Sequence, residues 1–224
     1  MPPEPASAGI GAIAIDLDGT LVDSAPDLAA AANNTLQAMG AGRLPTPAIR
    51  AMIGDGLDML VRRCLAASLE REPSATELDE ACRLMRRYYG QDVFGRGRVY
   101  PGVVEALARW QAGGLLLACV TNKASDLSRL LLRESGLAGY FSALYCADEP
   151  RQRKPSPELL LQFLRDAGVA AQRCVMIGDS VHDMLAAQAA EVRAVAVTYG
   201  YGNPLGAAAA PWQTVTRLDD LVLK

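Results

Sequence analysis

Residues 13–24 read IAIDLDGTLVDS, an apolar run that ends in two carboxylates and a turn. Side chains alternate along an extended strand, so we expect Asp16 and Asp18, two residues apart, to point the same way. Two carboxylates held that close repel each other unless a cation lies between them or one of them keeps its proton. Either arrangement is a chemical device, whereas the alternative is an ordinary strand that ends in two solvated acids.

Two later apolar runs also end in polar residues. Residues 115–120, LLLACV, are followed by TNK, and residues 174–177, CVMI, are followed by GDSVHD. Lys154 lies between these runs, within the segment RKPSPE. In open parallel sheets, ligands bind outside the carboxyl ends of the strands. The sequence therefore predicts one site that gathers a lysine and four carboxylates, which are Asp16, Asp18, Asp179 and Asp183.

Beyond residue 98, short apolar runs alternate with segments of helical spacing. Strands are expected near residues 115–120, 144–146, 174–177 and 194–197, and helices near 103–112, 125–135, 157–167 and 183–190. This alternation is typical of an α/β fold, and we expect a Rossmann-like parallel sheet with helices on both faces. Residues 24–98 show helical spacing without strand-like runs. We therefore expect a core of residues 9–23 and 99–224, with residues 24–98 inserted after the first strand as a helical cap domain.

Composition narrows the classes of function. Half of the 224 residues are apolar, but no apolar run is long enough to cross a bilayer, and the formal net charge of −3 argues against nucleic acid as a partner. Residues 1–8 have no lysine, arginine or apolar segment typical of a secretory signal, so we expect a frayed tail and a cytoplasmic protein. The five cysteines are far apart, which favours free thiols over disulfides or a zinc site.

Together the polar segments resemble the four ordered motifs of the haloacid dehalogenase-like hydrolases. The matching residues are DLDGT at 16–20, Thr121, Lys154, and GDS at 178–180 with Asp183. The segments YPGV at 100–103, VTNK at 120–123 and YGYG at 199–202 are most similar to those of phosphoglycolate phosphatases. The resemblance implies an enzyme that hydrolyses a small phosphate monoester, most specifically 2-phosphoglycolate. One departure is Glu191, which replaces the family's usual glycine and concerns only a helix C-cap.

The resemblance also implies catalytic roles. Asp16 would attack phosphorus and form an aspartyl-phosphate, because an ionised carboxylate needs no base to activate it. Asp18 would protonate the departing alkoxide and then take a proton from water. A halide leaves without a proton, so Asp18 favours phosphatase over dehalogenase chemistry. Lys154 would offset phosphoryl charge, although lysines are ordinarily solvated, and Thr121 would hydrogen-bond the phosphoryl oxygens.

Magnesium is the one cofactor expected, since an all-oxygen site beside a phosphate suits this ion. Its expected ligands come from four acids, Asp16, Asp18, Asp179 and Asp183. Asp18 would contribute its backbone carbonyl, and Asp183 would act through water or as an acid at a helix N-terminus. Backbone N–H groups at the strand ends would bind the phosphoryl group, namely those of Gly19, Thr20 and Asn122. Lys123 is expected to face water, and His182 to lie on a helix surface.

Substrate selection is expected in the cap, which would close over the site. The segment IGDG at 53–56 resembles the cap of phosphoglycolate phosphatases, and Arg63 would pair with a substrate carboxylate. Alternatively, Arg62 and Arg63 form the exposed face of an amphipathic helix. Phosphatases for N-acetylmuramic acid 6-phosphate, pyrophosphate or nucleoside monophosphates share the motifs and remain alternatives, as do a phosphotransferase and a non-catalytic metabolite-binding protein. The expected partner is a small phosphate ester, and the chain is expected to be a monomer or homodimer.

Overall fold

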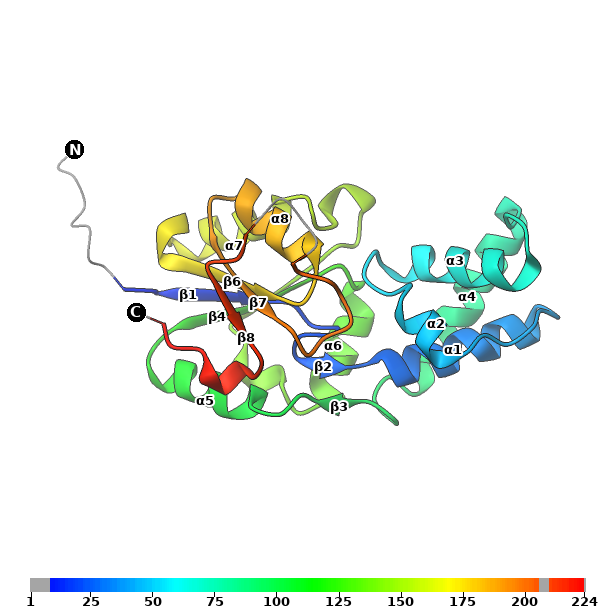
Figure 1. Ribbon diagram of the computed structural model, residues 1–224, viewed down its shortest axis with the longest axis horizontal. Coiled ribbons are helices and arrows are strands. Elements are labelled where there is room, and N and C mark those ends of the chain that lie inside the picture. Colours follow the sequence, from blue (N-terminus) through cyan, green and yellow to red (C-terminus); the bar gives the residue numbers. More distant parts are fainter. Residues whose placement is uncertain (1–8, 206–209, 224) are drawn as a thin grey trace.

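The computed structural model describes residues 9–205 and 210–223, so the tail predicted at residues 1–8 lies outside the described part of the chain. A six-stranded sheet with the order β5-β4-β1-β6-β7-β8 forms its centre (Figure 1). The strands are β1 (Ala12–Ile15), β4 (Leu116–Thr121), β5 (Ala143–Cys146), β6 (Cys174–Gly178), β7 (Arg193–Val197) and β8 (Gln213–Val215). Every neighbouring pair is parallel, which confirms the predicted α/β class.

Helices cover both faces of this sheet, because alternate strand residues face opposite sides. Ile13 and Ile15 of β1 share a core with the buried side chains of α5 (Val103–Ala112) and α6 (Ser125–Glu134). Ala12 and Ala14 share a second core with those of α7 (Glu158–Ala167) and α8 (Val181–Ala189). Short 3₁₀ helices complete the connections, namely η1 (Ala138–Tyr140), η2 (Pro150–Gln152), η3 (Ala171–Arg173) and η4 (Leu218–Asp220).

The strands and helices predicted after residue 98 are all present, with bounds that differ from the prediction by at most about two residues. The structure adds β8, which the sequence did not reveal. Its three residues, Gln213–Val215, are half-buried or exposed at the edge of the sheet, so they carry no apolar run. Edge strands need less burial than central ones and leave a weaker pattern.

A helical insertion, residues 25–91, lies between β2 (Val22–Asp23) and β3 (Arg98–Val99), which pair antiparallel. It comprises α1 (Ala25–Ala38), α2 (Thr46–Arg50), α3 (Leu57–Leu69) and α4 (Ala75–Gln91), and stands beyond one end of the sheet in Figure 1. Its buried side chains, among them Leu36, Leu65 and Met85, pack on one another and join the core of the α5 and α6 face. The α4 helix begins with a capping box between Ser74 and Glu77.

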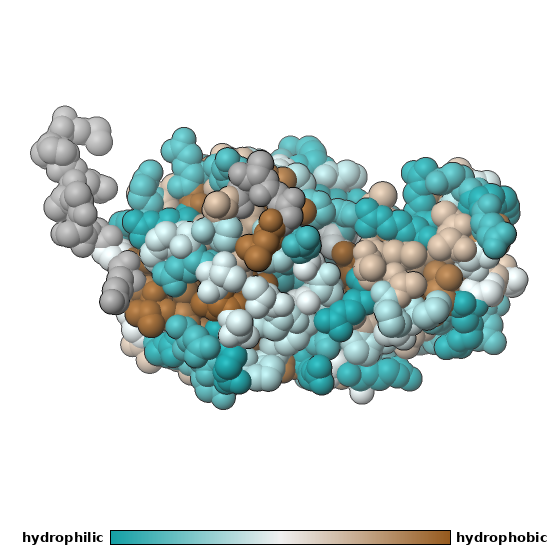
Figure 2. All heavy atoms as spheres, in the orientation of Figure 1, coloured by the Kyte–Doolittle hydropathy of each residue, from teal (hydrophilic) through white to brown (hydrophobic). Residues whose placement is uncertain are grey.

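On the face shown in Figure 2, hydrophilic side chains lie mainly around the margins of the sheet region and the helical insertion, and hydrophobic side chains gather over part of each. In the described ranges, no helix is both long and apolar enough to span a bilayer. All five cysteines are free, and Cys119 and Cys174 are buried in β4 and β6.

The helix C-cap at Glu191 forms without glycine. Glu191 has a φ of 57°, in the left-handed region, and its N–H donates to the Gln188 carbonyl at 3.1 Å. The Val192 N–H donates to the Ala187 carbonyl at 2.9 Å, which completes the turn after α8. The position therefore has the conformation that normally selects glycine, and the glutamate adopts it at a cost in backbone energy.

Candidate active site

The carboxyl ends of β1, β4 and β6 meet at one edge of the sheet, next to the helical insertion. Asp16 directly follows β1, and its backbone N–H donates to the Ile177 carbonyl of β6 at 2.9 Å. A pocket opens here, lined by residues of the sheet region such as Asp16, Thr121, Lys154 and Asp179, and by residues of the insertion such as Ile53, Leu57 and Leu60. The predicted convergence of three strand ends is therefore present.

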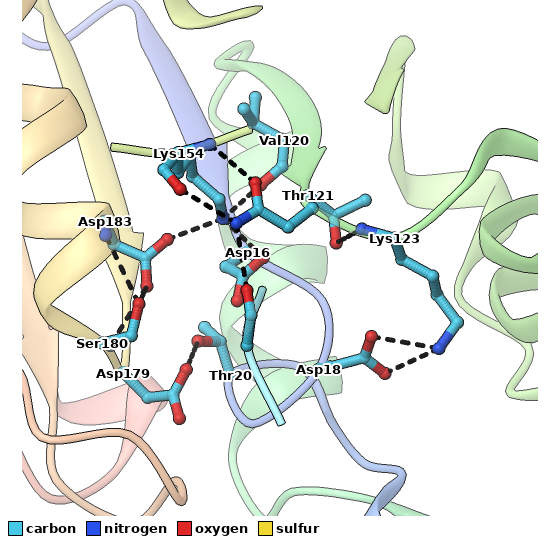
Figure 3. A network of polar contacts seen from close by, with 12 residues as sticks. Asp16, Asp18, Thr20, Val120, Thr121, Lys123, Lys154, Asp179, Ser180 and Asp183 are labelled. Carbon is cyan, nitrogen blue, oxygen red and sulfur yellow. Dashed lines mark hydrogen bonds and ion pairs between the residues drawn. The ribbon is translucent and has the colours of Figure 1, made fainter. Parts of the chain in front are cut away.

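Lys154 connects two of the four carboxylates (Figure 3). Its Nζ lies 2.6 Å from Oδ1 of Asp16 and 2.6 Å from Oδ1 of Asp183, and it donates to the Val120 carbonyl at 2.9 Å. These contacts use all three N–H donors of the ammonium group. Lys154 is only 4% exposed and Asp183 is fully buried, so the alternative of a solvated surface lysine is wrong.

Three buried acids, Asp16, Asp179 and Asp183, each place one oxygen within 4.8 Å of the others. Burial raises the pKa of Asp16 to about 8, against the opposing effect of Lys154 and with a further rise from Asp183 and Asp179. Burial, reinforced by Asp183, also raises the pKa of Asp179 to about 6. One lysine cannot neutralise three carboxylates, so this donor set fits a divalent cation that prefers oxygen ligands, as Mg²⁺ does.

A turn after β7 holds Asp179 in place. Oδ2 of Asp179 accepts hydrogen bonds from the N–H groups of Tyr201 at 3.0 Å and Gly202 at 2.8 Å, and Oδ1 accepts one from the Thr20 hydroxyl at 3.2 Å. A Cβ on Gly19 or Gly200 would overlap the Asp179 carboxylate. Gly19 and Thr20, predicted to bind substrate, thus also support the acidic group, and Gly19 has a φ of 91° that favours glycine.

Asp18 contacts a different cation from Asp16. Its carboxylate oxygens lie 3.0 and 3.1 Å from Nζ of Lys123 (Figure 3). The Ser24 hydroxyl donates a short hydrogen bond to one of these oxygens. Since β1 ends at Ile15, the alternation of side chains along the strand does not extend to Asp18. In the described structure the two carboxylates therefore contact two separate lysines, Asp16 contacting Lys154 and Asp18 contacting Lys123.

Lys123 is 7% exposed, so the expectation that it faces water is wrong. Besides Asp18, its Nζ contacts the hydroxyl of Tyr89 on α4 at 2.9 Å and lies 4.4 Å from the centroid of that ring. Burial lowers the pKa of Lys123, but Asp18 and Tyr89 more than offset this, so the pKa lies above its usual 10.5. This contact could not be predicted from the sequence, because Tyr89 belongs to the insertion and lies far from Lys123 in the chain.

The remaining predicted site residues are not all in the pocket. Thr121 and Asn122 line it, but Arg63 is not among the described lining residues. The Arg63 guanidinium instead donates to the Met52 carbonyl at 2.9 Å and pairs with Asp55, so it braces the loop between α2 and α3. Arg63 therefore lies against the loop between α2 and α3 rather than among the residues that line the pocket.

His182 is half-buried rather than on a free helix surface. Its Nε2 lies 3.5 Å from Oδ1 of Asp55, so α8 contacts the same loop that Arg63 braces. Ser180 caps α8 by accepting from the Asp183 N–H at 3.4 Å, and its own hydroxyl donates to Oδ2 of Asp183 at 2.6 Å. Asp183 therefore takes part in the capping of α8 and also belongs to the group of three buried acids.

Comparisons with known proteins identify the family. A family model described as haloacid dehalogenase-like hydrolase matches residues 13–197. The chain belongs to this family. A phosphoglycolate phosphatase from Nitrosospira multiformis is 42% identical to this hydrolase over 194 residues, covering 87% of this chain and 86% of the relative. A plasmid phosphoglycolate phosphatase from Cupriavidus necator is 43% identical over 200 residues, covering 88% and 85% of the two chains.

Solved structures also support the assignment of this chain to the family. A predicted phosphoglycolate phosphatase from Haemophilus somnus superposes with a TM-score of 0.88 at 30% identity, covering 94% of this chain and 96% of that one. CbbY from Rhodobacter sphaeroides, solved in complex with phosphate, has a TM-score of 0.80 at 22% identity, covering 94% and 96%, and shows the shared fold alone. The resemblance read from the motifs is therefore confirmed.

Proposed function

We propose that this hydrolase is a Mg²⁺-dependent phosphatase that cleaves 2-phosphoglycolate to glycolate and phosphate through an aspartyl-phosphate on Asp16. The observation that carries the proposal is the buried Asp16 carboxylate, paired with Lys154 at 2.6 Å inside a group of three acids. A purely structural ion pair needs no further buried acids, because each adds a desolvation cost. The names of the relatives support the same class of reaction.

In the first step, an oxygen of Asp16 attacks phosphorus and the bond between phosphorus and the leaving oxygen breaks. Lys154 offsets charge on the phosphoryl oxygens, and the Thr121 hydroxyl with the backbone N–H of Asn122 donates to them. Asp18, in its protonated form, gives its proton to the leaving oxygen, so that an alcohol departs. Asp16, Asp179 and the backbone carbonyl of Asp18 would hold Mg²⁺, with Asp183 as a further acid of the group, and the ion would supply positive charge to the phosphoryl group.

In the second step, water attacks phosphorus of the aspartyl-phosphate. Asp18, now ionised, takes a proton from that water, and the bond from phosphorus to the Asp16 oxygen breaks to release phosphate. Lys123 fits this cycle as the cation that holds the ionised form of Asp18, at 3.0 and 3.1 Å from its two oxygens. Each residue returns to its starting state.

The helical insertion is proposed to act as the cap, residues 24–98, over a core of residues 9–23 and 99–224. The cavity of about 60 Å³ is closed on the insertion side by apolar residues that include Ile53, Leu57 and Leu60. Among the described lining residues the cations are Lys123 and Lys154, and each is paired with a carboxylate, so an anionic substrate would need the further positive charge that Mg²⁺ would supply.

Phosphate release with Mg²⁺ tests the proposal, using 2-phosphoglycolate beside pyrophosphate, a nucleoside monophosphate and N-acetylmuramic acid 6-phosphate. Asp16→Asn should lose turnover by at least about 10³-fold, as expected when a nucleophile is removed. Asp126→Asn is the matched control, because Asp126 lies exposed on α6 and pairs with Arg86. It should retain wild-type activity.

The outcomes separate the alternatives. Preference for a larger ester overturns the substrate assignment and leaves the mechanism in place. Equal turnover by Asp16→Asn and wild type overturns the nucleophile. Transfer to added glycerol in preference to water indicates a phosphotransferase, and an inert wild-type protein that still binds phosphate esters indicates a metabolite-binding protein.

A further inference from the structure

The side chain of Asn122 joins two segments that are far apart in the chain. Its Nδ2 donates to the carbonyl of Gly54 at 3.0 Å and to the carbonyl of Lys154 at 3.1 Å, and its Oδ1 accepts from the Lys154 N–H at 2.7 Å. Asn122 is only 8% exposed, and both N–H donors of its amide are used. Because these contacts use both donors of the amide, the side chain has no free N–H group with which to bind a substrate.

The three contacts differ in which part of the molecule they reach. Lys154 lies in the sheet region, in the segment that follows η2, whereas Gly54 lies in the loop between α2 and α3 of the insertion. Gly54 and Lys154 both line the pocket. The amide of Asn122 therefore bridges the catalytic lysine and the loop that covers the site.

A second contact links the same two segments one residue away. The Arg153 guanidinium lies 2.7 Å from Oδ1 and 3.1 Å from Oδ2 of Asp58, in the first turn of α3. It also packs on Gly56, where a Cβ would lie 3.2 Å from its central carbon. Among the described residues, Nε of Arg153 is buried without a partner, so packing rather than full hydrogen bonding holds this side chain.

Lys154 depends on these supports because its ammonium must satisfy three acceptors at once. Asp16, Asp183 and the Val120 carbonyl all lie within 2.9 Å of Nζ. The backbone of Lys154 has both its N–H and its carbonyl on one side chain, that of Asn122. A shift of the insertion loop pulls on Asn122 and Arg153, and thereby on the backbone that sets the reach of the lysine.

We propose that Asn122 is a positioning residue that couples docking of the helical insertion to the placement of the Lys154 side chain, with the Arg153–Asp58 pair as the second contact. The coupling gives the cap a role beyond covering the pocket, because closure over a bound ester completes the support of the charge-stabilising lysine. Its kinetic consequence rests on the proposed phosphatase function, but its structural consequence does not.

Backbone hydrogen exchange on the full chain tests the coupling without any substrate. In Asn122→Ala, which keeps the backbone N–H, exchange should rise by at least about threefold both in residues 52–58 and in residues 153–156. In Asp58→Ala, a change in the insertion alone, exchange should rise in residues 153–156. Arg86→Ala is the matched control, since it removes another contact between insertion and core, to Asp126, that does not reach Lys154.

Steady-state kinetics on 2-phosphoglycolate provide the second readout. Asn122→Ala should lower kcat by about 10- to 100-fold with little change in KM, as expected when a catalytic group is misplaced by a fraction of an ångström to an ångström. Asp58→Ala should lower kcat less, and the double variant should fall short of the product of the two effects, because both act on one element. Arg86→Ala should match wild type.

Two results overturn the proposal. In the first, hydrogen exchange in Asn122→Ala rises in residues 153–156 but not in residues 52–58, and exchange in Asp58→Ala does not change in residues 153–156. The other is a double variant whose kcat effects simply multiply. If Asn122→Ala does not fold, Asp58→Ala alone decides, because Asp58 is half exposed and its loss leaves the cores intact. If wild type hydrolyses no ester, the exchange data still decide the coupling.

Discussion

Lys154→Met removes the one cation that contacts both Asp16 and Asp183 in the described structure. Methionine fills a similar volume, so the change isolates the charge and its hydrogen bonds. Breaking a buried ion pair from one side costs about 3 to 5 kcal/mol in free energy of unfolding, because a buried carboxylate is left unpaired. A chain of this length loses about 2 to 4 °C of melting temperature per kcal/mol, so the expected drop is about 6 to 20 °C.

Calorimetric or fluorimetric melting at pH 8 without metal measures this drop. Arg86→Met is the control, since Arg86 and Asp126 are 51% and 60% exposed and such a pair contributes at most about 1 kcal/mol. The drop should shrink at pH 5, where the raised pKa of Asp16, about 8, keeps that carboxyl neutral and its pairing with Lys154 is already lost. If Lys154→Met melts within about 2 °C of Arg86→Met at pH 8, the buried charge argument is refuted.

Three further predictions follow from the same geometry. Burial raises the pKa of Asp16 to about 8 and of Asp179 to about 6 from 3.8, so the folded state binds more protons than the unfolded state, and stability of the metal-free protein falls as pH rises from 4 to 8. Added Mg²⁺ should therefore raise the melting temperature more at pH 8 than at pH 5, and an equal rise would contradict the acidic cation site. Glu191→Gly should stabilise by about 0.5 to 1 kcal/mol in urea unfolding, because φ is 57°, and a loss of stability would show that the glutamate is not strained. Gly200→Ala should lower kcat/KM by at least about tenfold by displacing Asp179, whereas Gly139→Ala, with open space around its Cβ, should not; equal activities would argue against the close approach.

The sheet was predictable because its central strands are apolar and end in polar residues. Asp16, Lys154 and Asp179 could be placed together from this pattern alone, since parallel strands share one carboxyl edge. The contact of Lys154 with Asp183 was not predicted, because it depends on the turn that caps α8. β8 escaped prediction because an edge strand of three residues has no apolar pattern.

The surroundings of Asp18 could not be read from the sequence. Lys123 directly follows Thr121 and Asn122, and a lysine after a strand is ordinarily solvated. It is buried because α4 of the insertion brings Tyr89 over it, a contact between residues 34 apart in the chain. The contacts of Arg63 could not be predicted for the same reason, because its partners Met52 and Asp55 belong to a loop whose path cannot be derived from the spacing of apolar residues.

The position of β1 in the sheet has a consequence for how the protein is made. This strand leaves the ribosome before its neighbours β4 and β6, which begin at residues 116 and 174. β1 and the adjoining Asp16 therefore have no strand partners until about 100 further residues have been synthesised. At about 5 to 20 residues per second this takes about 5 to 20 seconds. The helical insertion emerges in that interval and packs locally, so we expect it to fold first and the catalytic edge to assemble last.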